Sequence, residues 1–381
     1  MFGDVFCICI FVGNKGIMKV FVAVSAFVFT VFPAFAQLTT PADGTSVRAR
    51  VSERVGLTDI SIDYGRPAVK GRDGKIWGEV VHTGFKNQGF GNGKDSPWRA
   101  GANENTVIEF STDVAIEGKE LKAGKYGFFV AYGADECTLI FSTATSSWGS
   151  YFYDPAEDVM RVKVKPVSIP YLKERLTYEF SDETDSTATI TLFWERKGIP
   201  FRVSTALHSL QMASFDRELR GERGFDPHAL VQVAGYLQEH NTRMDDALAY
   251  VTRASASMPT FGVLSLKADI LRKMHKEQEA DSTMKVALER ASVRELHNYG
   301  RTLLRDGKNA EALEIFRLNY DRHPHAYTAC VGMMRGCAAN GKSKDAIKYG
   351  KKALPVAPDD ANRKYVEDAI ASLKAGKELS Q

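Results

Sequence analysis

The sequence predicts two domains of different class, an all-β sandwich or barrel followed by an all-α array of helical repeats. Three observations predict this. The chain has 381 residues, enough for two domains of ordinary size. Apolar residues recur with a period of two between about residues 45 and 203, as in half-buried strands. Past residue 204 the period becomes 3.6, and identical residues recur at a fixed interval, as in helical repeats.

Composition and charge limit the function classes. The hydrophobic fraction is 44% and the charged fraction 25%, as in folded soluble proteins. The net charge of +3 gives no electrostatic reason to expect a nucleic-acid partner. The five cysteines are too few and too scattered for a disulfide scaffold.

Residues 18–36 have the pattern of a secretory signal peptide. Lys19 supplies the positive start, residues 20–32 are nearly all apolar, and residues 34–36 read AFA, a small-residue cleavage site. We expect cleavage between Ala36 and Gln37, translation from Met18, and a periplasmic or secreted mature chain without a membrane span. The alternative is an uncleaved membrane anchor, which needs about 20 apolar residues without a processing site.

The predicted β-domain contains nine alternating runs with turn residues between them. They cover residues 58–64, 106–110, 113–116, 126–132, 138–141, 158–164, 175–180, 188–194 and 199–203. Short strands at such spacing favour a sandwich or barrel, because a parallel sheet needs room for crossover helices. Residues 82–96 interrupt the pattern with several glycines and asparagines. This segment lacks the spacing of a phosphate loop and predicts a surface loop.

A series of ordered motifs carries a family resemblance. Residues 55–72 read VGLTDISIDYGRPAVKGR and residues 98–104 read WRAGANE. They are followed by LKAGKY at 121–126, WG at 148–149, YD at 153–154 and DVMRVKVKP at 158–166. Over residues 46–203 the chain resembles the exported bacterial domain of unknown function 2911. The resemblance implies a β-rich fold and an envelope location, and it brings no established activity.

The sequence departs from the family pattern at Gly65, where serine is usual, at Ala100, where threonine is usual, and in a longer glycine-rich insertion before Trp98. If either hydroxyl served chemistry, this chain has lost it.

Aromatic, guanidinium and amide groups in two of these motifs form a candidate ligand site. Its residues are Tyr64, Arg66, Trp98, Arg99, Asn103 and Glu104. Arginine and asparagine beside aromatic rings could hold a small anionic or sugar ligand. The alternative is an Arg–Glu ion pair with packed tryptophans at a barrel mouth.

The helical half repeats every 32 to 34 residues. Gly307 and Gly341, and likewise Pro324 and Pro358, lie 34 positions apart. Units that start near 228, 261, 293 and 327 share an alanine in the second helix, at positions 247, 280, 312 and 346. This pattern resembles the tetratricopeptide repeat over about residues 228–358, followed by a capping helix at 359–373. The resemblance implies a scaffold whose concave face takes a protein or peptide partner. The alternatives are a buttress for the β-domain or a dimerisation element.

Catalytic and metal motifs are weak. The β-domain has one histidine, His82, so a metal site of several histidines cannot form there, and we expect no cofactor or metal. The acidic residues Asp154, Glu157 and Asp158 could serve a glycoside hydrolase, though acidic pairs in loops are mostly solvated. Cys137 lies in a predicted strand, and Cys330 and Cys337 are seven residues apart on one helix, too far for a disulfide.

These observations predict four segments: a signal peptide at 1–36, a β-domain at 37–203, a connecting helical segment at 204–227, and repeats with a capping helix at 228–381. The expected function is non-catalytic binding or scaffolding in the cell envelope, with a protein partner on the repeats. The alternative is a hydrolase-type enzyme whose site lies in a pocket of the β-domain.

Overall fold

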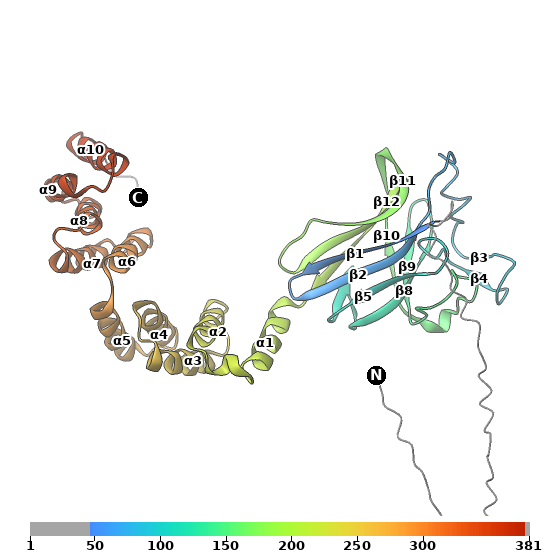
Figure 1. Ribbon diagram of the computed structural model, residues 1–381, viewed down its shortest axis with the longest axis horizontal. Helices are drawn as coiled ribbons and strands as arrows, with labels where there is room; N and C mark the ends of the chain where they lie inside the picture. Colours follow the sequence, from blue (N-terminus) through green and yellow to red (C-terminus); the bar gives the residue numbers. More distant parts are fainter. Residues whose placement is uncertain (1–45, 378–381) are drawn as a thin grey trace, which may run out of the picture.

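The computed structural model describes residues 46–377, which form a β-sandwich followed by a curved array of helices (Figure 1). The predicted fold class is therefore confirmed. The predicted signal peptide lies outside the described residues. Among the described residues no helix is long and apolar enough to cross a membrane.

The sandwich consists of two antiparallel sheets and a small hairpin. The first sheet has the order β1-β2-β5-β8-β9-β10, with strands Val47–Val55, Thr58–Arg66, Thr106–Phe110, Gly124–Ala131, Cys137–Ser142 and Asp158–Val164. The second has the order β11-β12-β6-β7, with strands Val167–Ser181, Thr187–Thr205, Val114–Ile116 and Lys119–Leu121. The hairpin pairs β3 (Lys86–Asn87) with β4 (Asp95–Ser96).

One apolar core lies between the two sheets. Both sheets contribute aromatic rings to it, and the rings of Phe128 on β8 and Phe201 on β12 lie 5.5 Å apart, centroid to centroid. Both rings are 1% exposed, so the interior is filled with side chains. The first sheet ends at β1 on one side and β10 on the other, so it is an open layer. The fold is thus a sandwich, which settles the predicted alternative of sandwich or barrel.

Two features of the sheets differ from the predicted runs. The runs at 188–194 and 199–203 belong to one long strand, β12, in which Glu195 has a positive φ of 53° and shifts the pairing with β11. β1 is absent from the predicted runs. It is an edge strand with mostly exposed or half-buried side chains, so its sequence has few of the large apolar residues that mark a core strand.

The helical part contains four helix pairs and a final helix. The pairs are α2 (Pro227–Glu239) with α3 (Met244–Ser257), α4 (Phe261–Lys273) with α5 (Glu277–Arg290), α6 (Val293–Arg305) with α7 (Asn309–Arg322), and α8 (Tyr327–Ala339) with α9 (Ser343–Ala353). α10 (Asp360–Lys374) follows as the predicted capping helix. The first helix of each pair lies on the inner side of the curve (Figure 1).

The repeated small residues mark the contacts between paired helices. Ala247, Ala280, Ala312 and Ala346 are all 0% exposed. Phe316 of α7 is also fully buried and lies against the backbone of Gly300 on α6. Cys330 and Cys337 of α8 are buried free thiols, as expected from their spacing.

α1 (Leu207–Glu218) follows β12 directly and joins the two parts. None of its residues is fully buried, and its half-buried side chains pack against the α2–α3 pair. We propose that the sandwich and the helical array unfold as separate units, with the boundary just after Thr205. Calorimetry would then resolve two unfolding transitions, and a single cooperative transition would contradict the proposal.

Candidate functional site

A cavity of about 290 Å³ opens at one side of the sandwich and is called the sandwich cavity below. Its walls come from segments far apart in the sequence: Ser46, Pro67, Arg72, Val80, His82, Gln88, Trp98, Arg99, Gly101, Ala102, Asn103, Ser150 and Trp194. Gln88 belongs to the predicted surface loop at 82–96, which thus forms one wall. Among the described residues, the lining contains two arginines and no aspartate or glutamate.

Three of the six candidate residues line the sandwich cavity. The ring of Trp98 stacks on Trp194 at 6.1 Å between centroids, and its backbone pairs with Val130 of β8. Arg99 Nη1 donates to the Asn103 carbonyl oxygen at 2.8 Å, so both residues are fixed on one turn. The WRAGANE motif therefore forms part of the cavity wall.

The other three candidates do not line it. Tyr64 is 4% exposed and packs edge-on against the ring of Tyr178. Arg66 Nε donates to the Leu176 carbonyl oxygen at 3.0 Å. Glu104 forms an exposed ion pair with Arg48 at 3.2 Å. Glu104 thus forms an Arg–Glu ion pair, as in the alternative interpretation of the motif, but its partner is Arg48 of β1.

The guanidinium of Arg99 is held in place by two neighbours. Its Cζ atom lies 4.9 Å from the centroid of the Tyr151 ring. Its other neighbour is Gly149, where any Cβ atom would clash with the guanidinium. Gly149 also has a positive φ of 63°, a second reason for glycine there. The WG motif at 148–149 thus makes room for the Arg99 side chain.

The candidate set missed ten of the thirteen lining residues, among them Arg72, His82, Ser150 and Trp194. Arg72 ends the quoted motif at 55–72, and its Nε and Nη2 atoms donate to the carbonyls of Val69 and Ala68 at 2.9 and 2.7 Å. The sequence did contain a signal for Arg72, because it is a second guanidinium in the motifs that carry the family resemblance. The sequence contained no such signal for His82 and Trp194, because only the packing of the folded sheets brings them near Trp98.

At the sandwich cavity, the buried indole Nε1 of Trp194 has no hydrogen-bond partner within residues 46–377. The ring nitrogens of His82 form no hydrogen bond of good geometry with the described residues, but backbone groups of Thr83 and Gly84 lie close enough to raise its pKa. Burial has the larger effect, and the charge of Lys86 acts in the same direction, so the pKa of His82 is lowered and its imidazole is mostly neutral at pH 7. Trp194 is only 1% exposed.

The acidic residues considered for hydrolysis lie outside this lining. Asp158 accepts hydrogen bonds from the Tyr153 hydroxyl at 2.6 Å and from Arg161 Nε at 2.7 Å. Asp154 caps a short 3-10 helix that begins at Pro155. Within the described chain, no group of three or more potential metal ligands comes together.

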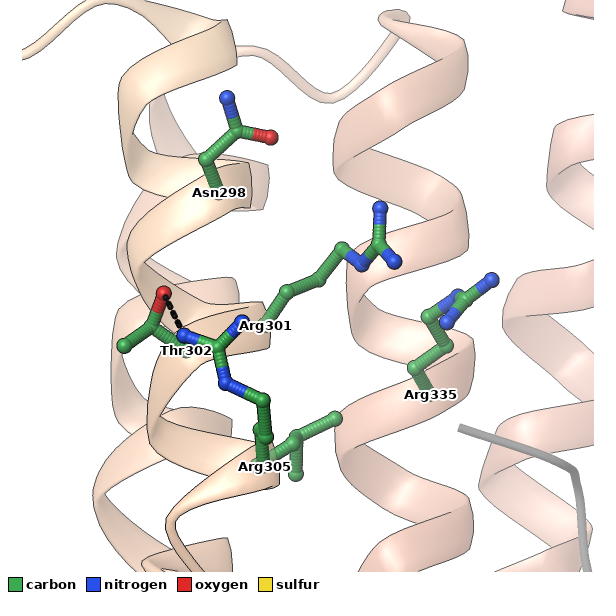
Figure 2. A pocket seen from close by; sticks show the side chains of 6 residues that line it. Asn298, Arg301, Thr302, Arg305 and Arg335 are labelled. Atoms are coloured by element: carbon green, nitrogen blue, oxygen red, sulfur yellow. Dashed lines mark hydrogen bonds between the residues drawn. The ribbon is translucent and has the colours of Figure 1, made fainter. Parts of the chain in front are cut away.

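A second cavity, of about 390 Å³, is lined by residues of α6 and α8. It is called the arginine groove below, and its lining is Asn298, Arg301, Thr302, Leu304, Arg305 and Arg335. Figure 2 shows Arg301 extending from α6 toward α8, where Arg335 faces the same space. Arg305 contacts the Thr302 hydroxyl at 3.5 Å.

The three arginines of the groove have no acidic partner. No carboxylate of residues 46–377 lies within 4.0 Å of Arg301, Arg305 or Arg335. Arg335 lies 5.2 Å from the centroid of the Tyr365 ring, and its buried Nε has no hydrogen-bond partner among the described residues. The groove is therefore positively charged and offers many free N–H donors.

His297 lies near these arginines. Burial lowers the pKa of its imidazole to about 4, and the charges of Arg335 and Arg301 act in the same direction. Its Nδ1 is buried without a partner among the residues described, and its ring centroid lies 5.9 Å from that of Phe316. Protonation of His297 therefore opposes the folded state of the α6–α8 region.

We predict that the helical array loses stability as the pH falls from about 6.5 to about 4. In that window the unfolded chain binds a proton at His297 and the folded chain does not, so unfolding is favoured as the pH decreases. The expected loss is on the order of 2 kcal/mol. Urea unfolding at several pH values measures it. The His297→Leu variant should show a smaller loss than the wild type, and equal pH profiles would contradict the prediction.

The fold and the two cavities define a class: a β-sandwich joined to a tetratricopeptide-like array. Residues 46–203 match the model of a family described as a protein of unknown function, DUF2911. The resemblance to this family that the sequence motifs indicated is thus confirmed for the sandwich. A comparison with curated proteins found no match.

Several solved tetratricopeptide proteins are similar to the helical part at low sequence identity. YrrB, described as a TPR protein with an unusual peptide-binding site, is 17% identical, with coverage of 43% of this chain and 86% of that chain and a TM-score of 0.27. Pseudomonas aeruginosa pilF is 21% identical, with coverage of 41% and 71% and a TM-score of 0.28. A thermophilic TPR protein of Thermus thermophilus, TTC0263, is 17% identical, with coverage of 43% and 91% and a TM-score of 0.27.

Proposed function

We propose that the protein is a non-catalytic binding protein of the cell envelope whose helical repeats hold an acidic segment of a protein partner in the arginine groove. The observation that carries this proposal is the set of three arginines without a carboxylate partner among residues 46–377, all around one open cavity. Close like charges repel one another, and a carboxylate in the groove would relieve that repulsion.

Arginine suits such a ligand. Its planar guanidinium forms two parallel hydrogen bonds to a carboxylate, and such charge-assisted bonds are stronger than neutral ones. The groove is lined by α6 and α8, and the first helices of the repeats lie on the inner side of the curve (Figure 1). An acidic peptide complements the charge of this surface.

The array has little opportunity to buttress the sandwich. From α2 onward it curves away from the β-sheets, and α1 is the connection between the two (Figure 1). The remaining alternative, dimerisation through the repeats, is addressed by measuring the mass of the protein in solution during the same experiment.

We predict that a fluorescein-labelled hexaglutamate peptide binds the purified protein in a salt-sensitive manner. The Arg301→Gln/Arg335→Gln double variant should bind it at least tenfold more weakly, because each charge-assisted hydrogen bond contributes about 1.5–3 kcal/mol. Fluorescence anisotropy titration measures the affinity, with a hexalysine peptide as the ligand control.

Arg317→Gln is the matched protein control. Arg317 lies on α7, outside the groove, where it pairs with Glu314 at 3.2 Å. This variant should bind hexaglutamate as the wild type does. Equal affinity in the double variant and in the control would contradict the assignment of the groove. Dimers that dissociate only in the double variant would favour dimerisation instead.

The envelope location is part of the same proposal and is supported by the pattern of residues 18–36. N-terminal sequencing of the protein from cells should begin at Gln37. A mature chain that begins at residue 1 or 18 would rule out cleavage of the signal peptide.

A small ligand in the sandwich cavity is the second part of the proposed function. The buried Nε1 of Trp194, which has no acceptor among residues 46–377, favours it. The cavity lining also favours binding over hydrolysis, because its titratable groups are two arginines and one neutral histidine, without a carboxylate.

A further inference from the structure

We propose that the sandwich cavity binds the oxyanion of a small organic ligand, a carboxylate or phosphate group, between Arg72 and Arg99. This inference specifies the chemistry of the small-ligand part of the proposed function and rests on it. It is independent of the repeats, because the cavity is lined by the sandwich and by Ser46 at its edge.

The first argument is the charge of the lining. Within residues 46–377, Arg72 and Arg99 donate only to backbone carbonyls: Arg72 to Val69 and Ala68, Arg99 to Asn103. No carboxylate of residues 46–377 lies within 4.0 Å of either guanidinium. Each guanidinium has five N–H groups, so both retain donors after these bonds. Two uncompensated cations at one cavity favour an anionic ligand.

The second argument is a buried donor that has no acceptor among the described residues. Trp194 Nε1 can only donate, and the residue is only 1% exposed. A buried donor without an acceptor is rare in native proteins, because it loses its hydrogen bonds to water and gains nothing in return. Ligand oxygen atoms would supply the acceptor that Trp194 lacks.

The third argument concerns size and apolar character. A volume of about 290 Å³ far exceeds the roughly 30 Å³ that one water molecule occupies. The stacked rings of Trp98 and Trp194 form part of the wall, beside Val80 and Pro67. A bare inorganic ion would leave this apolar surface uncovered, whereas an organic anion would cover it. An uncharged sugar would leave the two guanidinium charges uncompensated.

The experiment is a titration of the full-length protein with three small probes: benzoate, phenyl phosphate and uncharged benzamide. Indole N–H signals in a two-dimensional nitrogen–proton NMR spectrum report on the site, with the Trp194→Phe variant to assign its signal. We expect saturable shifts of the Trp194 signal with benzoate or phenyl phosphate, and none with benzamide. The stronger of the two anions identifies which oxyanion the cavity prefers.

Arg72→Gln and Arg99→Gln should each weaken anion binding at least tenfold, as measured by calorimetric titration. Arg66→Gln is the matched control, because Arg66 belongs to the same motif as Arg72 but does not line the cavity. A circular dichroism spectrum of each variant verifies that it is folded. Absence of saturable binding by both anions, equal binding in all three variants, or equal binding of benzamide would overturn the inference. None of these outcomes bears on the arginine groove, which is tested by its own peptide.

Discussion

Replacing Phe316 with alanine is expected to lower the free energy of unfolding of the helical array by about 3–5 kcal/mol. The Phe316 ring is fully buried, and it lies against backbone of two helices. A Cβ added at Gly300 of α6 would lie 2.5 Å from the ring, and Cβ atoms added at Gly332 and Gly336 of α8 would lie 2.6 and 2.7 Å from it. Three glycines have no side chains to fill the space that the ring leaves. The cavity should therefore persist, and the loss should fall near the upper end of the range.

Phe225→Ala is the matched control, because Phe225 is 85% exposed and its removal should change stability by less than about 0.5 kcal/mol. Calorimetry of both variants separates the effect by domain. The Phe316→Ala variant should lower the transition of the helical array and leave that of the sandwich unchanged. A loss below about 1 kcal/mol, less than usual for a buried ring, would mean that α6 and α8 collapse into the space and would contradict the prediction.

The helical repeats could be predicted because every unit uses the same contact. Ala247, Ala280, Ala312 and Ala346 occupy one position in four successive units, so a fixed interval in the sequence reports one packing arrangement. The contacts of Phe316 with Gly332 and Gly336 could not be predicted in this way. These contacts join one pair of units and are not repeated at the fixed interval in the sequence.

The sandwich cavity was only partly predictable. Trp98, Arg99 and Asn103 are neighbours in the sequence, so a single motif identified them together. Arg72 and Trp194 reach the same cavity from separate segments, and their meeting depends on how the sheets pack. Sequence periodicity specifies which face a side chain occupies and gives no information on which strand lies opposite.

Tyr64 and Glu104 are two candidate residues that do not line the sandwich cavity, each for a different physical reason. Tyr64 shares the parity of Ile60 and Ile62 on β2, and all three are buried, so alternation alone places its ring in the core. Glu104 pairs with Arg48, and Arg48 lies on β1, a strand that the predicted runs did not include. Its partner could not be foreseen without that strand.

The second large effect is expected from Gly65→Ser, which introduces the serine that the family resemblance leads us to expect at this position. Gly65 is buried on β2, and a Cβ atom there would clash with the carbonyl oxygen of Ala102. The opposing turn cannot easily move, because the Ala100 carbonyl accepts hydrogen bonds from the Thr106 hydroxyl at 3.0 Å and the Tyr178 hydroxyl at 2.8 Å. We predict that the free energy of unfolding of the sandwich falls by about 2–3 kcal/mol.

Gly71→Ser separates this clash from ordinary backbone strain. Gly71 has a positive φ of 72°, and a Cβ atom there would meet nothing within 4 Å. A serine at that position should cost only about 1 kcal/mol, from the left-handed backbone alone. Urea unfolding of both variants measures the difference. A larger loss for Gly71→Ser than for Gly65→Ser would show that the turn at residues 100–103 yields to the added atom.

The turn at residues 100–103 also forms one wall of the sandwich cavity through Gly101, Ala102 and Asn103. A turn displaced by the serine side chain should therefore change the Trp98 indole signal in the same NMR spectrum. We expect serine at position 65 to shift this turn and with it the cavity wall, whereas an unchanged Trp98 signal would show that the turn stays in place.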